Sequence, residues 1–395
     1  MPIALFALTI SAFAIGTTEF VIVGLIPTIA NDLNVSLPSA GLLVSLYALG
    51  VAIGAPVLTA LTGKWNRKNL LLALMLLFTI GNIVAYYSPN YESLIIARIL
   101  TGLAHGVFFS IGSTIATSLV SKDKEASAIA IMFTGLTVAL VTGVPLGTFI
   151  GQEFGWRFTF LAVSALGLIS LFGSYILIPK NLKESIPTKI SQQISVLTNP
   201  RLVLVYLITA LGYGGTFIAF TYLVPILEQI TGFDSKMVAI LLLVYGISVA
   251  IGNIWGGKLA DRLGPIQALY RIFIGLALVL VTFSFTATNP YLAVATILVW
   301  GAFAFGNVPG LQVYVVQLAK EHAPHAVDTA SGLNIAAFNV GIAFGAWSGG
   351  LIVENYSLIN TPWIGAIVVL IALALTYFSG MLDKKAKLQT NIIRD

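Results

Sequence analysis

The stretch LVSLYALGVAIG at residues 43–54 returns in altered form as LLLVYGISVAIG at residues 241–252. Leu43, Tyr47 and Gly54 each recur 198 positions later in the chain. The same offset holds in two further hydrophobic segments, for the pairs Ala12/Ala210, Gly16/Gly214, Leu25/Leu223, Pro27/Pro225, Gly143/Gly341, Gly147/Gly345 and Gly151/Gly349. One deeply apolar unit written twice predicts a pseudo-symmetric membrane bundle with a cavity between its halves.

The composition agrees with a membrane bundle. Hydrophobic residues make up 58% of the 395 residues, and charged residues make up 9%, against about 25% in a typical soluble domain. A helix needs about 20 apolar residues to cross a bilayer. Runs of that length predict twelve spans, at roughly 3–30, 38–62, 69–88, 91–119, 124–150, 156–178, 201–230, 236–260, 265–287, 290–318, 326–352 and 361–382.

The predicted fold class is therefore an all-α membrane protein with twelve transmembrane helices in two six-helix bundles. We place the bundles at residues 1–178 and 201–395, and a cytoplasmic linker at 179–200, where the longest polar connection lies. The first run does not resemble a signal peptide, because no Lys or Arg precedes it and it contains Glu19 and Pro27.

The basic residues predict the orientation of the chain. If the N-terminus is cytoplasmic, 17 of the 20 Lys and Arg residues fall inside, Arg157 and Lys236 fall outside, and Arg98 lies within a span. The positive-inside rule then places both termini on the cytoplasmic side. We expect the membrane to be a bacterial inner membrane. The net charge of +5 is an insertion signal, so we expect a lipid bilayer and no nucleic acid as partner.

Small residues form one stripe in each half of the chain. Gly143, Gly147 and Gly151 follow a four-residue spacing, and the second stripe repeats it 198 residues later. Such stripes let helix backbones approach closely in lipid, so one interpretation is static packing and the other is a gating surface on which the halves rock. Pro145 lies inside the first stripe and should bend its helix. The corresponding residue in the second copy is Ala343, so the proline is not repeated.

Glu19 is the most informative ionisable residue, because it lies about two-thirds of the way along the first predicted span. A charged carboxylate near the middle of a bilayer costs about 2.5–3.5 kcal/mol on insertion scales. A partner, water or a bound proton relieves that cost, and burial favours the protonated form. We therefore expect Glu19 to carry protons; the alternative is a structural carboxylate fixed by an arginine.

Arg98 and His105 are two further ionisable residues that lie well inside a predicted span. Arg98 should lie at a depth similar to that of Glu19, and it keeps its proton, so it can stabilise an ionised Glu19 or hold an anionic substrate. Arg98, Gly102 and His105 share a helix face by their spacing. His105 is either a proton relay or an ordinary hydrogen-bonding residue.

The two copies differ at these positions, since Phe217, Thr296 and Phe303 stand 198 residues after Glu19, Arg98 and His105. We infer proton handling in the N-terminal half and more of the substrate wall in the C-terminal half. Candidates for the wall are Phe108, Phe109, Tyr213, Phe217, Phe220, Asn307, Gln312, Asn334, Phe338 and Asn339.

Other kinds of site are not indicated by the sequence. The chain has no Cys, and two of its three His residues, His322 and His325, fall in a predicted cytoplasmic loop, so we expect no disulfide and no metal. No nucleophile–base pair or phosphate-binding loop stands out, which argues against an enzyme. We expect no cofactor, with protons as the coupling ion.

Three motifs resemble those of the major facilitator superfamily, specifically its twelve-helix drug/proton antiporter family. The run from Thr17 to Pro27 is similar to the first helix of the branch of arabinose/sugar efflux and chloramphenicol-resistance permeases. Arg98-Ile-Leu-Thr-Gly102 resembles a fourth-helix motif linked to proton transfer, and the Gly135–Gly147 run resembles a fifth-helix motif associated with antiport. The resemblance covers nearly the whole chain and implies the major facilitator fold and export.

One family motif is altered. The loop between the second and third helices usually reads Gly-x-Leu-Ala-Asp-Arg-x-Gly-Arg-Lys, and its Asp is thought to latch cytoplasmic helix ends. Here Gly63 stands in place of the acid, while the second copy keeps Asp261 and Arg262. The resemblance implies a gating role for these two residues and an altered gate in the first half.

The sequence therefore predicts a monomeric, proton-coupled exporter of a small organic molecule that works by alternating access. An uncoupled facilitator or importer, with a structural Glu19, is the first alternative, and a transporter-like sensor or membrane enzyme is the second. The cargo itself is not identified, because the resemblance favours sugars, nucleosides or drugs without choosing among them.

Overall fold

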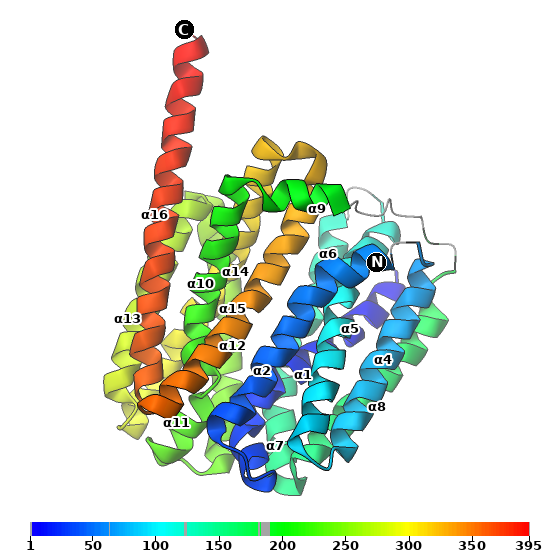
Figure 1. Ribbon diagram of the computed structural model, residues 1–395, viewed down its shortest axis with the longest axis vertical. Helices are drawn as coiled ribbons and strands as arrows, with labels where there is room; N and C mark the ends of the chain where they lie inside the picture. The colour runs from blue at the N-terminus through cyan, green and yellow to red at the C-terminus, as the bar shows by residue number, and fades with distance from the viewer. Residues whose placement is uncertain (1, 63, 122–124, 181, 183–189, 395) are drawn as a thin grey trace.

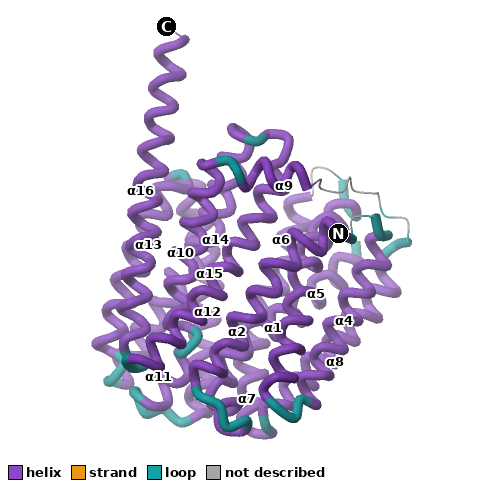
Figure 2. Tube along the Cα trace, viewed as in Figure 1, coloured by secondary structure: helices purple, strands orange, loops and turns teal. Residues whose placement is uncertain are grey.

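Helices account for all of the regular secondary structure in the part of the chain that the structure describes (Figures 1 and 2). The structure is a computed structural model, and it describes every residue except 1, 63, 122–124, 181, 183–189 and 395. Within these residues, twelve helices are long and apolar enough to cross a membrane. The predicted all-α fold with twelve spans is confirmed.

The first six spans comprise α1 (Ala4–Asp32), α2 (Leu37–Ile53) continued by η1 (Gly54–Leu58) and α3 (Thr59–Leu61), α4 (Arg67–Tyr87), α5 (Tyr91–Ser118), α6 (Glu125–Val138) continued by η3 (Ala139–Gly143) and α7 (Val144–Phe154), and α8 (Trp156–Leu177). The last six comprise α10 (Pro200–Phe220) continued by α11 (Leu223–Gln229), α12 (Ser235–Leu263), α13 (Pro265–Thr286), α14 (Pro290–His322) followed by the short η4 (Pro324–Ala326), α15 (Val327–Asn355) and α16 (Asn360–Arg394).

Between the two sets, α9 (Ile190–Leu197) lies within the predicted linker. In Figure 1 it runs across the end of the bundle from which the last part of α16 projects. The division into bundles at residues 1–178 and 201–395 stays a prediction.

Polar residues between the apolar runs begin several of these helices. A side-chain oxygen accepts a hydrogen bond from the backbone N–H groups of the first turn, which would otherwise lack a partner. The residues that cap helices in this way are Ser36, Asn66, Asn90, Asn199, Asp234 and Asn289. The short polar breaks in the sequence therefore end one span and start the next.

Among the described residues, two spans are interrupted by π-helical turns, which are rare and often lie at functional sites. One is η1 in the second span, which contains Pro56, and the other is η3 in the fifth span, directly before the turn with Pro145. Pro145 lacks the N–H that would continue the α-helical ladder, which is consistent with the π-helical turn before it. The predicted bend stays a prediction. At the corresponding place in the second copy, around Ala343, α15 is continuous.

The two glycine stripes pack helices of the same half against each other. A Cβ atom at Gly143, Gly147 or Gly151 would overlap a side chain of α1, and one at Gly341, Gly345 or Gly349 would overlap the backbone of α10. The contacts in this structure therefore support static packing. A gating role for Gly143, Pro145 and Gly147 stays a prediction.

The halves meet chiefly along two pairs of spans. α2 lies beside α15, and η3 and α7 lie beside α12, as Figure 1 shows for the first pair. The Ser45 hydroxyl donates to the carbonyl oxygen of Ala343 over 2.7 Å, and a Cβ atom at Gly246 would lie 2.5 Å from the carbonyl oxygen of Leu140. α6, in contrast, packs on α1 and α5 of its own half. The junction thus involves one end of the fifth span and not the other.

An exposed ion pair joins the halves at the same end, between Lys236 Nζ and Glu153 Oε1 at 3.7 Å. Both residues belong to the predicted outer side. If that orientation holds, the junction is closed on the outside.

Candidate functional site

Glu19 lies in the middle of α1 among residues that are almost completely buried. Its exposed fraction is 7%, against 0% for Thr18 and 3% for Phe20. Its carboxylate oxygen Oε2 is 4.0 Å from Nδ1 of His105 on α5. The structure thus brings together the acid and the histidine that the sequence indicated.

Tyr47 on α2 connects His105 with Arg98. Its hydroxyl lies 3.0 Å from His105 Nδ1, and the guanidinium carbon of Arg98 lies 4.1 Å from the centre of its ring. That position over the ring face allows a cation–π interaction. A Cβ atom at Gly102 would overlap the Tyr47 backbone, so Arg98, Gly102 and His105 all face α2, as their spacing predicted.

Arg98 is 1% exposed and binds backbone oxygens of two helices. Nη1 donates to the carbonyl oxygen of Thr18 over 2.7 Å, and Nε donates to that of Leu43 over 3.4 Å. These bonds confirm that Arg98 lies at the depth of Glu19. The two side chains form no ion pair within 4.0 Å, and Arg98 Nη2 has no hydrogen-bond partner. We call Glu19, Tyr47, Arg98 and His105 the ionisable cluster.

Next to this cluster, five aromatic rings from both halves of the chain pack together. We call them the junction aromatic cluster: Phe20 of α1, Tyr213 and Phe217 of α10, Phe305 of α14 and Phe338 of α15. The rings of Phe20 and Phe217 are 6.4 Å apart, and Tyr213 lies 5.0–5.4 Å from Phe217, Phe305 and Phe338. Phe20 directly follows Glu19 on α1, so the two clusters adjoin.

A second group of rings continues from Phe217 into the C-terminal half. Phe220 stacks on Tyr245 with ring centres 4.9 Å apart, and Tyr245 meets Trp300 edge-on at 5.8 Å. Trp300 donates its indole N–H to Thr216 over 2.8 Å. The predicted wall residues Tyr213, Phe217, Phe220 and Phe338 are therefore brought together.

Other predicted wall residues lie apart from this group. Phe108 and Phe109 belong to a separate apolar cluster within the N-terminal half, although Phe109 does contact His105 at 5.0 Å between ring centres. Gln312 and Asn334 bond to each other, with Asn334 Nδ2 donating to Gln312 Oε1 over 2.9 Å. Their remaining bonds, to Ser331 and Thr209, satisfy both amides internally.

Asn307 and Asn339 are buried, and each amide nitrogen donates to a carbonyl of its own helix. Each leaves its Oδ1 oxygen without a hydrogen-bond partner. Their helices also carry Phe305 and Phe338, but neither amide nitrogen bonds to a residue of the two clusters. Substrate binding by these residues stays a prediction.

The predicted gating residues Asp261 and Arg262 are exposed at the end of α12, and neither forms an ion pair with another described residue. Gly63, where the family loop carries an acid, lies outside the described residues. A cytoplasmic latch therefore stays a prediction.

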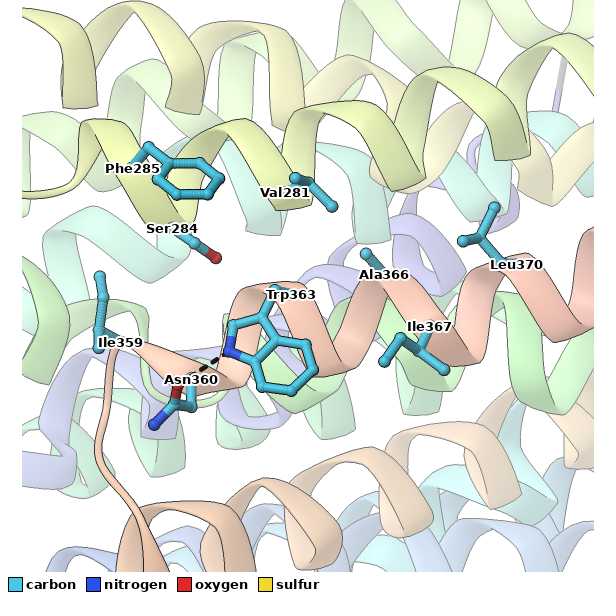
Figure 3. Close-up of a pocket in the computed structure, with 9 residues that line it drawn as sticks. All are labelled: Val281, Ser284, Phe285, Ile359, Asn360, Trp363, Ala366, Ile367 and Leu370. Carbon is cyan, nitrogen blue, oxygen red and sulfur yellow. Dashed lines mark hydrogen bonds between the residues drawn. The ribbon is translucent and has the colours of Figure 1, made fainter.

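A groove of about 530 Å³ lies between α13 and α16 (Figure 3). Phe285, Trp363 and Ile367 line it and are between 41% and 79% exposed, so it belongs to the outer surface of the bundle. It contains no ionisable residue. This groove faces lipid and is not part of the candidate site.

The sequence interpretation missed three residues of the site. Phe20 and Phe305 gave no signal beyond their aromatic character, which is common in apolar spans. Tyr47 did give one, because it is part of the stretch that recurs at Tyr245. No group of three or more potential metal ligands occurs among the described residues.

Comparisons with known proteins agree with this architecture. A family model described as Major Facilitator Superfamily matches residues 8–328. The chain is 54% identical to the uncharacterized MFS-type transporter YtbD of Bacillus subtilis (strain 168), covering 97% of this chain and 96% of the relative. It is 42% identical to the inner membrane transport protein YdhP of Escherichia coli (strain K12), covering 95% of each.

A solved structure with a similar fold is that of a nucleoside transporter, NupG (D323A mutant). Its TM-score is 0.75 with 17% sequence identity, and the match covers 95% of this chain and 99% of the other. At this identity the likeness shows the shared fold alone.

Proposed function

Since the chain belongs to the Major Facilitator Superfamily and is thus a transporter of small solutes, we propose that it exports a small organic molecule in exchange for protons. We place it in a bacterial inner membrane, and we propose that it works by alternating access as a monomer. This scheme needs no cofactor besides the coupling protons.

One observation carries the proposal: a buried carboxyl group lies where the two halves of the chain meet. Glu19 lies 4.0 Å from His105 in its own half, and the adjacent Phe20 packs on Phe217 and Phe305 of the other half. A rocking motion of the halves would therefore change the surroundings of this carboxyl group. That is the requirement for a proton carrier that opens to each side in turn.

The proposed cycle assigns a role to each member of the ionisable cluster. Cargo binds from the cytoplasm while Glu19 is ionised and stabilised by the nearby charge of Arg98. Outward opening releases the cargo and lets Glu19 take up a proton, and the protonated form returns. His105 and Tyr47 lie within reach to relay or orient that proton. A potential of 100 mV supplies about 2.3 kcal/mol per proton.

Everted membrane vesicles provide the test. Respiration acidifies their interior, and a pH-sensitive dye reports the gradient while sugars, nucleosides and amphiphilic drugs are added one at a time. An exporter that exchanges protons should dissipate part of the gradient with its cargo. Counterflow that is the same at every pH, with no effect on the gradient, would instead identify an uncoupled facilitator.

Cross-linking α2 to α15 should stop transport. The Ser45 hydroxyl and the Ala343 carbonyl oxygen are 2.7 Å apart across the junction, and the chain has no native Cys that would interfere. We expect Ser45→Cys with Ala343→Cys, joined by a short reducible cross-linker, to lose transport and to regain it on reduction. The halves could not separate on that side while the link holds.

The matched control is a contact of the same kind within one half. Thr231 donates to the carbonyl oxygen of Ala287, also over 2.7 Å. Cross-linking Thr231→Cys with Ala287→Cys should leave transport nearly unchanged. Equal activity of both linked proteins would contradict alternating access at this junction.

A further inference from the structure

The hydroxyl group of Tyr245 is a buried polar group without an internal partner. Tyr245 is 2% exposed, and its hydroxyl oxygen makes no hydrogen bond in the structure. Its repeat counterpart, Tyr47, does bond through its hydroxyl, to His105. Native proteins rarely leave a buried polar group unpaired, so an unpaired one calls for an explanation.

The surroundings of Tyr245 fix the position of this hydroxyl. Phe220 stacks on one face of its ring, and Trp300 meets the ring edge-on. Trp300 is itself held by its bond to Thr216. The phenol is therefore pre-oriented by packing, which reduces the entropy that a bound ligand would cost.

The hydroxyl belongs to the same region as the junction aromatic cluster. Phe220, which stacks on Tyr245, also contacts Phe217, and Phe217 contacts Tyr213. Tyr213, Phe305 and Phe338 keep 5–9% of their surface exposed, whereas Phe217 keeps none. Phe220 and Phe217 therefore link the ring of Tyr245 to Tyr213 and to the less buried edge of the cluster.

Resting on the function proposed above, we infer that Tyr245 and Tyr213 bind the cargo by hydrogen bonds, and that the cargo is a planar aromatic compound with N–H or O–H donors. Membership of the superfamily alone predicts neither the role of these two tyrosines nor this class of ligand. Tyr245 sets specificity for the donor group, and the rings of the junction aromatic cluster accommodate the planar ring.

The chemistry of the site selects this class over the others. Aromatic rings prefer offset or edge-to-face contacts with another ring, which a planar ligand supplies. The Glu19 carboxylate only accepts hydrogen bonds, whereas the phenol hydroxyls both donate and accept, so a ligand with N–H or O–H donors can bond to all three groups. A sugar would need polar partners for several hydroxyl groups, and an organic cation without donors would leave the Tyr245 hydroxyl unpaired.

Arg98 does not make the site selective for anionic ligands. Its guanidinium is held on the N-terminal side by the carbonyl oxygens of Thr18 and Leu43 and by the Tyr47 ring. The two rings that pack on Tyr245, those of Phe220 and Trp300, carry no charge.

Thermal unfolding of the purified transporter tests the unpaired hydroxyl without any ligand. Tyr245→Phe removes only that oxygen, so it should unfold at the same temperature as the wild type or at a higher one. Tyr206→Phe is the control, since the Tyr206 hydroxyl donates to the Ala330 carbonyl oxygen over 3.1 Å, and it should unfold at a lower temperature. Tryptophan fluorescence suits this measurement because the chain has six Trp.

Ligand binding is then measured at equilibrium in detergent, without a proton gradient. The probes are 2-aminopurine and 4-aminophenol, which are planar donors, against tetraphenylphosphonium and arabinose. We expect the planar probes to bind the wild type and to bind Tyr245→Phe about three- to tenfold more weakly, as loss of one hydrogen bond predicts. Tyr206→Phe should bind them like the wild type.

Each outcome decides the inference. Binding of only tetraphenylphosphonium or arabinose, or of none of the four probes, overturns the ligand class. Equal affinity of wild type and Tyr245→Phe, or destabilisation of Tyr245→Phe as large as that of Tyr206→Phe, overturns the role of the hydroxyl.

Failure of the proposed function looks different. In that case the planar probes bind through Tyr245 but do not dissipate the proton gradient of everted vesicles. If arabinose dissipates the gradient instead, proton-coupled export stands and this inference fails.

Discussion

Glu19→Gln is expected to abolish uphill transport while leaving exchange intact. One proton moving across 100 mV can support about a fiftyfold concentration ratio of an uncharged cargo, and the variant should reach a ratio of about one. The amide has nearly the shape of the carboxyl group but binds no proton at neutral pH. Cargo on both sides of the membrane should still exchange, because that step needs no net proton movement.

Proteoliposomes and labelled cargo are used to measure both uphill accumulation and exchange. Accumulation is followed with a pH difference, and counterflow is followed without one. Glu92→Gln is the control, because Glu92 is an exposed carboxylate in the first turn of α5. It should behave like the wild type in both assays. Accumulation by Glu19→Gln to the level of the wild type would show that another group carries the proton.

Arg98→Lys is expected to have the second largest effect, although it keeps the positive charge. The guanidinium reaches Thr18 and Leu43 on two helices and also lies over the Tyr47 ring, which a single ammonium group cannot reproduce. Loss of a buried charged hydrogen bond costs about 1.5–3 kcal/mol. We expect a clear drop in the unfolding temperature and at least a tenfold loss of coupled transport.

Arg157 offers a matched control, because it makes the same kinds of contact away from the ionisable cluster. Its guanidinium lies 4.2 Å from the Trp156 ring centre, and it bonds the Ser88 carbonyl oxygen and Asp32. Arg157→Lys should reduce stability while coupling per transported molecule stays unchanged. If Arg98→Lys and Arg157→Lys have the same effect on coupling, Arg98 is only a structural residue.

Much of the fold could be predicted because hydropathy and the repeat report directly on burial in lipid. The ends of helices were predicted less well. α14 continues to His322 and α16 to Arg394, beyond the predicted ends at 318 and 382. Hydropathy marks where an apolar run stops, whereas backbone hydrogen bonds continue a helix into water.

The seventh span shows a second kind of difference. It was predicted as one helix, but α10 ends at Phe220 and α11 begins at Leu223. Pro225 cannot donate to the Thr221 carbonyl oxygen, which is consistent with a break at this place. Its counterpart, Pro27, lies inside a continuous α1. A proline thus accompanies a helix break in the second copy and lies within a continuous helix in the first. Tertiary packing decides whether a helix tolerates the backbone hydrogen bond that proline cannot make.

The sequence predicted the site residues that are costly to bury in an apolar span. It did not predict all of the aromatic residues, which are common in such spans. Glu19, Arg98 and His105 stand out in apolar spans, and the structure brings them together. Gln312 and Asn334 also stand out, but they bond to each other. Sequence cannot show whether two polar residues satisfy one another, since that depends on how α14 and α15 are rotated against each other.

Proton release from purified transporter on addition of cargo is the most direct test of the central claim. In weakly buffered solution with a pH indicator, cargo binding should displace protons from the wild type, and the signal should vanish in Glu19→Gln. No release from the wild type, or equal release from both proteins, would contradict proton exchange at Glu19.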